Sequence, residues 1–146
     1  MFLLDTDALS FSGPTSALSE LQRARWHDWI RAHHEDIQMS VVTIMEVRFG
    51  IERLLRKGAT SKANRLKSWI VALEVTHRDR LIKVDSSIAH HAGVLLAKAE
   101  AKGFSPSTED ALIAASAALN SFTLITRNHR DMSAMIDECV DPLSLG

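Results

Sequence analysis

FLLDTD, residues 2–7, is a short apolar run that ends at a carboxylate, and it decides how the chain can fold. Three later segments place an acid just after a strand-like run or early in a helix pattern: MSVVTIMEV at 39–47, SPSTEDALIAASA at 105–117 and TLITRNHRD at 123–131. Because the carboxyl ends of parallel strands lie along one edge of a sheet, we expect the four acids to meet there. They are Asp5, Glu46, Asp110 and Asp131.

Apolar spacing divides the chain into alternating strands and helices. Strands are predicted at 2–4, 37–42, 81–84 and 122–126, with a short last strand near 139–141. Helices are predicted at 15–34, 43–57, 61–75, 86–102 and 108–120. This alternation predicts an α/β fold with a mainly parallel sheet covered by helices. Since the chain contains no internal repeat or linker, residues 1–146 are expected to form a single domain.

The composition is that of an ordinary globular protein. The 146 residues are 46% hydrophobic and 24% charged, with a net charge of −1, so global charge does not indicate nucleic acid or membrane as a partner. The single Cys139 excludes an internal disulfide and a cysteine zinc site. No apolar run approaches the roughly 18 residues of a membrane span, and no basic region precedes the first apolar run. We therefore expect a protein of the reducing cytoplasm.

Three of the four acids also have a purely structural explanation. Thr43-x-x-Glu46 and Ser107-x-x-Asp110 match the capping-box pattern, and a looser version ends at Asp131. The helix dipole favours an acid in the first turn by roughly 0.3–1 kcal/mol, so capping is the simpler explanation for any one of them alone. Asp5 directly ends a strand and does not belong to a capping box. Four caps on one edge of the sheet would be a coincidence, which favours a shared site.

Carboxylates gathered at one edge repel each other, and something positive must offset that repulsion. An oxygen-only set without His or Cys suits Mg²⁺ or Mn²⁺. A metal-activated water can attack a phosphodiester, so the pattern indicates a metal site that handles phosphate. The hydroxyl of Thr6 could support such a site, and Asn128 could orient a water or phosphate or cap a helix. Arg127 could pair with an acid, while the basic stretch that begins at Arg48 could contact phosphates or be solvated helix surface.

The same segments resemble PIN-domain proteins and, within them, the VapC/FitB-like toxins of bacterial type II toxin–antitoxin modules. The resemblance covers nearly the whole chain and is carried, in this order, by LLDTDALS, SVVTIMEVRFGI, DALIAASA and LITRNHRDM. It implies a three-layer α/β/α fold around a mainly parallel sheet and Mg²⁺- or Mn²⁺-dependent cleavage of RNA. It also implies a homodimer and a cognate antitoxin, which we expect to be a DNA-binding protein encoded by a small adjacent gene.

The resemblance implies that Asp5, Glu46 and Asp110 coordinate the metal and that Asp131 is a fourth catalytic acid. It also matches Thr6 and Asn128 to polar positions of the family, and Arg48 and Arg127 are expected to steer the RNA backbone. Two departures are Asp7, where family members often carry Asn, and Met132, where an aromatic residue commonly follows the fourth acid. The resulting hypothesis is an endoribonuclease toxin.

Other functions stay open at this stage. A housekeeping or DNA-directed nuclease would use the same acids. A catalytically silent or DNA-associated regulatory PIN protein would instead act through a partner complex. The partner surface is predicted on the helices that carry Trp26, Trp29 and Trp69, because large surface aromatics often anchor interfaces. The alternative is that all three tryptophans belong to the core.

Overall fold

A five-stranded parallel sheet forms the centre of the molecule in the computed structural model, which describes residues 1–145. The strands lie in the order β3-β2-β1-β4-β5, and every neighbouring pair is parallel. Their bounds are β1 Phe2–Leu4, β2 Ile37–Ser40, β3 Leu81–Ile82, β4 Thr123–Ile125 and β5 Cys139–Val140. The predicted parallel sheet is confirmed, and β1 lies at its centre between β2 and β4.

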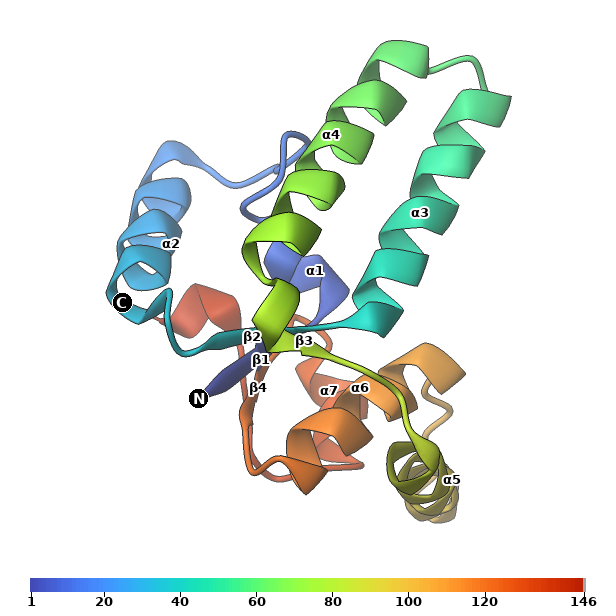
Figure 1. Ribbon diagram of the computed structural model, residues 1–146. Helices are drawn as coiled ribbons and strands as arrows, with labels where there is room; N and C mark the ends of the chain where they lie inside the picture. Colours follow the sequence, from blue (N-terminus) through green and yellow to red (C-terminus); the bar gives the residue numbers. More distant parts are fainter. Residues whose placement is uncertain (146) are drawn as a thin grey trace.

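Helices cover both faces of the sheet and produce three layers (Figure 1). One face is covered by α1 (Thr6–Ser10), α2 (Glu20–His33), α3 (Val41–Arg56) and α4 (Thr60–Thr76). The other face is covered by α5 (Ser86–Ala101), α6 (Thr108–Leu119) and α7 (His129–Ser133). Of two 3₁₀ turns, η1 (Arg78–Arg80) connects α4 to β3, and η2 (Pro142–Ser144) follows β5. Within residues 1–145, no helix combines the length and apolar character that crossing a membrane requires.

The central strand supplies both hydrophobic cores. Successive side chains of a strand point to opposite faces, so Leu3 packs against the α5–α7 layer and Leu4 against the α1–α4 layer. Both leucines are fully buried. Burial on both faces explains why this strand is a continuous apolar run without polar alternation, as parallel sheets require.

Small side chains bring α6 close to the sheet. Ala111, Ala114, Ala115 and Ala117 are all fully buried in the core on the α5–α7 side. Because α6 is packed along its length, its first turn is held at the carboxyl edge of the sheet. That first turn carries Asp110.

Several predicted boundaries are wrong because a local cap fixes the residue at which each helix begins. The strand predicted at 37–42 ends at Ser40, whose hydroxyl accepts a hydrogen bond from the Val42 backbone N–H at 3.1 Å and begins α3. The helix predicted from residue 15 begins at Glu20, after a complete capping box between Ser19 and Gln22. The short helices α1 and α7 were not predicted, since five residues are too few to show a helical period.

The tryptophans of α2 belong to the core, so the prediction that they anchor a surface interface is wrong. Trp26 and Trp29 are 2% and 8% exposed, and their rings stack with centroids 5.5 Å apart. The Trp26 indole N–H donates to Ser12 Oγ at 2.9 Å, and Phe2 meets Trp29 edge-on at 5.1 Å. This cluster fixes α2 against the sheet. Trp69, in α4, is only partly buried.

Candidate active site

A pocket of about 340 Å³ opens at the carboxyl edge of the sheet, beside β1 and β4. From β1 the chain first proceeds outward through β2 and β3, and then returns to β4 on the other side of β1. Such a switch point is where parallel α/β sheets usually bind ligands. The pocket brings together acids from three distant segments and is lined by Asp5, Thr6, Asp7, Glu46, Asp110, Ile113, Arg127 and Asn128.

Asp5 is the most deeply buried acid of the pocket. Its side chain is held by the Ala8 backbone N–H, which donates to Oδ1 at 2.8 Å, so Asp5 caps α1. Asp5 is not part of a capping box, because the third residue of α1 is Ala8, but it is the N-cap of a helix that begins directly after β1. Burial, followed by the charges of Asp7 and Asp110, raises the pKa of Asp5 from 3.8 to about 6, although hydrogen bonds from Thr126 and Ala8 oppose the rise. A carboxylate this costly to ionise is unusual for a mere cap.

Glu46 is fixed by a contact between elements that lie 40 residues apart. The Thr6 hydroxyl donates to Glu46 Oε1 at 2.6 Å and lies 3.2 Å from Thr43 Oγ1. Burial raises the pKa of Glu46, the Thr6 hydrogen bond lowers it, and Asp110, Glu109 and Asp7 raise it further. The capping box suggested for Thr43 and Glu46 does not form, because α3 begins two residues earlier and Thr43 is buried inside it.

Asn128 joins Asp110 to Asp131. Its Nδ2 donates to Asp110 Oδ2 at 3.0 Å and lies 3.4 Å from Asp131 Oδ2. Burial raises the pKa of Asp110, hydrogen bonds from Asn128 and Ser107 lower it, and the charges of Asp131 and Asp7 raise it. Ser107 Oγ accepts from the Asp110 backbone N–H at 3.1 Å, which is one half of the predicted capping box. Asp131 itself does not line the pocket; the Asn128 amide and the effect of its charge on Asp110 link it to the site.

The two arginines expected at the site lie in different places. Arg127 lines the pocket, and its Nε is 3.8 Å from Asp141 Oδ1. Arg48 lies outside the pocket on the exposed face of α3, where its Nη2 is 2.9 Å from Glu52 Oε1. Arg48 follows Glu46 by two residues. Residues two apart on a helix lie on different faces, so the Arg48 side chain points away from the acids.

Sequence reasoning missed Thr126 as part of this site. Thr126 follows β4, is fully buried, and its hydroxyl accepts from the Asn128 backbone N–H at 3.0 Å. The Thr126 hydroxyl also hydrogen-bonds Asp5. The signal was available: Thr126 follows β4 as Asp5 follows β1, so both residues emerge at the same edge of the sheet.

The donor set fits a hard divalent cation. The residues that line the pocket include four carboxylates and one cationic side chain. The atoms that could coordinate a metal there are the oxygens of carboxylate, hydroxyl and amide groups. Within residues 1–145, no three acidic, histidine or cysteine side chains already surround one position. Mg²⁺ commonly keeps several of its waters and is held by one or two carboxylates, which suits such a set of acids.

Comparison with known proteins identifies the fold family. The model of the PIN domain family matches residues 3–135. The chain belongs to the PIN domain family. It is 33% identical over 120 residues to the plasmid stability protein StbB of Pseudomonas syringae pv. tomato, an alignment that covers 78% of this chain and 84% of StbB.

Solved structures agree with this assignment. The structure of FitAcB from Neisseria gonorrhoeae matches with a TM-score of 0.82 and 26% identity, over 99% of this chain and 100% of that chain. VapBC2 from Rickettsia felis, bound to a DNA fragment from its promoter, has the same fold with a TM-score of 0.71 at 18% identity, over 96% of this chain and 98% of that chain. The predicted PIN-like three-layer fold is confirmed.

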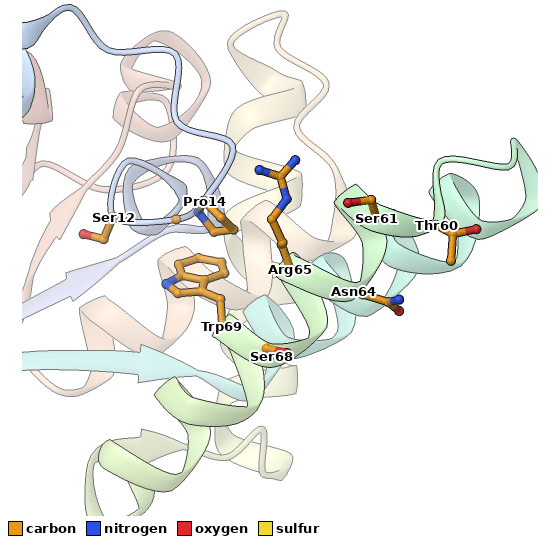
Figure 2. A pocket seen from close by; sticks show the side chains of 9 residues that line it. Ser12, Pro14, Thr60, Ser61, Asn64, Arg65, Ser68 and Trp69 are labelled. Atoms are coloured by element: carbon orange, nitrogen blue, oxygen red, sulfur yellow. The ribbon is translucent and has the colours of Figure 1, made fainter.

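A second cavity of this PIN domain, about 970 Å³, lies between the loop that follows α1 and the first half of α4. Its walls share no residue with the acidic pocket, and Arg65 is the charged residue among them. Figure 2 shows the Trp69 ring beside Pro14, with the Arg65 side chain extending near it. A Cβ at Gly13 would lie 3.3 Å from the Trp69 ring and 3.1 Å from the Ser10 carbonyl oxygen, so the close approach of loop and helix favours glycine there.

Proposed function

We propose that this PIN domain is a divalent-metal-dependent endoribonuclease that acts as the toxin of a type II toxin–antitoxin pair. The observation that carries the proposal is the convergence of Asp5, Glu46 and Asp110 on one pocket, with the pKa of each raised. PIN domains are generally nucleases, and the similarity to a plasmid stability protein supports a role in a toxin–antitoxin system.

In this proposal Asp5, Glu46 and Asp110 hold Mg²⁺ or Mn²⁺, directly or through water. The ion, when bound, offsets the clustered charge and lowers the pKa of a water that attacks the phosphodiester. The protein supplies orientation: Ala8 fixes Asp5 and Thr6 fixes Glu46.

The remaining polar residues of the pocket complete the proposed site. Asn128 orients Asp110 through its amide hydrogen bond. Asp131 acts indirectly, by contacting the same Asn128 amide. Arg127 is placed to contact an RNA phosphate at the pocket mouth. Arg48 lies outside the pocket, so any contact that it makes with RNA is with a nucleotide away from the cleaved phosphodiester.

We further propose that a cognate antitoxin contacts the cavity between α4 and the loop that follows α1. This cavity combines the cationic Arg65 with the apolar face of Trp69. Such a pair suits an acidic or aromatic side chain of a partner. The homodimer remains part of the proposal, with Trp69 replacing the buried Trp26 and Trp29 as the aromatic residue available to a partner.

The decisive experiment is induced expression with and without the neighbouring gene, followed by an RNA cleavage assay of the purified chain. We expect RNA cleavage in Mg²⁺ or Mn²⁺, its loss in EDTA or in Asp110→Asn, and protection by the neighbouring gene's product. Cleavage of DNA in place of RNA would indicate a DNA-directed nuclease. Absence of both metal binding and cleavage in a folded wild-type protein would indicate a silent binding module.

A further inference from the structure

A third pocket adjoins the acidic site on the outer side of α3. It has a volume of about 510 Å³ and is lined by Met45, Glu46, Phe49, Ser107 and Glu109. Glu46 lines both pockets, so the two spaces adjoin at that side chain. Met45 and Phe49 are 51% and 63% exposed and lie one helical turn apart. These two side chains form an exposed apolar pair directly beside the candidate active site.

The two walls of this pocket have complementary chemistry. Phe49 and Met45 provide an apolar face, and Glu109 and Ser107 provide a carboxylate and a hydroxyl on the first turn of α6 and its cap. Glu109 is close enough to Glu46 to raise the pKa of that acid. A flat ring that carries amino groups at its edge satisfies both walls: its face stacks on Phe49 and its amino group donates to Glu109. Adenine, cytosine and guanine have such an amino group, and uracil does not.

On the face of α3 that carries Met45 and Phe49, the residues of the next turn are the charged Glu52 and Arg53, while the exposed Leu55 lies on a different face of the helix. Arg53 and Arg56 follow on the exposed side, and the Arg53 guanidinium lies 5.6 Å from the centroid of the Phe49 ring. A protein interface of standard size needs about 800 Å² per partner, which favours a longer apolar stripe than two side chains. An aromatic ring next to arginines is instead the arrangement that binds single-stranded nucleic acid, with bases on the ring and phosphates on the cations.

We propose that Phe49 is a base-stacking residue for single-stranded RNA, a role that rests on the proposed ribonuclease function. A base next to the phosphodiester at the acidic pocket stacks on Phe49, Glu109 accepts a hydrogen bond from its amino group, and Arg53 contacts the strand's backbone. A base paired in a duplex is already stacked and cannot enter, so the subsite selects single strands. It also selects adenine, cytosine or guanine over uracil at that position.

The test measures binding separately from cleavage. An RNA oligonucleotide containing 2-aminopurine is titrated into the full chain in EDTA, on an Asp110→Asn background that removes one charge repelling the phosphates. Stacking on Phe49 should quench the fluorophore. Phe49→Ala should raise Kd roughly 10-fold and abolish the quenching, because the base loses its stacking partner. Phe49→Trp should restore both, and Leu21→Ala, at an α2 residue that is also 63% exposed, should change neither.

Two further measurements separate the possible outcomes. In the active protein, Phe49→Ala should raise KM more than it lowers kcat, and Glu109→Gln should weaken the discrimination against uracil. Parental affinity and quenching in Phe49→Ala would overturn the inference. So would conversion of a dimer to a monomer by Phe49→Ala with unchanged RNA affinity, because the face would then be an interface between copies. If the wild type cleaves no RNA, the proposed function fails while Phe49-dependent quenching still supports a base-binding site.

Discussion

Replacing Asp5 with Asn tests whether this acid is kept for function at the expense of stability. The buried carboxylate has its pKa raised from 3.8 to about 6. At 1.36 kcal/mol per pH unit, ionised Asp5 destabilises the metal-free protein by about 3 kcal/mol above pH 7. Asn keeps the shape and can still accept from the Ala8 N–H, but it loses an acceptor oxygen for Thr126, at a cost of about 1 kcal/mol. We expect a net stabilisation of about 1–3 kcal/mol at pH 8.

The stabilisation expected from Asp5→Asn depends on pH. Because the folded-state pKa is raised, Asp5 contributes no penalty below pH 3.8, where it is protonated in both states. The penalty grows as the pH rises from 3.8 to about 6 and is constant above that. The difference in unfolding free energy between Asp5→Asn and wild type should therefore increase over that window and then level off.

Urea unfolding in EDTA from pH 4 to pH 8 measures this difference, and an RNA cleavage assay in Mg²⁺ runs beside it. Asp36→Asn, at an exposed acid, is the matched control and should unfold like the wild type. Mg²⁺ should stabilise the wild type more than Asp5→Asn, since ligands stabilise the state that binds them. Cleavage by Asp5→Asn should fall at least about 100-fold, as expected when a metal ligand is lost. Equal stabilities at every pH, or wild-type cleavage by Asp5→Asn, would refute the reasoning.

Three further variants test other parts of the site and core. Thr6→Val removes the hydrogen bond that lowers the pKa of Glu46, so the acidic limb of the kcat/KM profile against pH should move to higher pH; an unchanged profile would separate Glu46 from the chemistry. Asn128→Ala removes the donor that orients Asp110 and should reduce kcat roughly 10- to 100-fold while the melting temperature changes little, as measured by cleavage kinetics and circular dichroism. Trp26→Ala should lower the free energy of unfolding by about 3–5 kcal/mol in urea titrations, because it empties a fully packed site; a surface tryptophan would show almost no loss.

The spacing of apolar residues along the sequence predicted the parallel sheet and the edge at which the acids lie. Short apolar runs alternating with helical periods leave few other topologies, and strand ends in a parallel sheet necessarily share an edge. The position of Asp5 directly after FLL and of Asp110 after a Ser cap therefore predicted their common location. Boundaries were less predictable, since Val41 and Val42 favour a strand locally and a serine cap starts the helix instead.

Packing alone decided what the side chains do at that edge. Burial gives Asp5 its raised pKa, and burial depends on which helices cover the strand. The Thr6 hydroxyl reaches Glu46 across 40 residues only because α1 and α3 are packed together. Asp131 stops short of the pocket because the Asn128 amide lies between it and Asp110. A local pattern carries no information on such distances, because they are set by contacts between segments that the sequence keeps far apart.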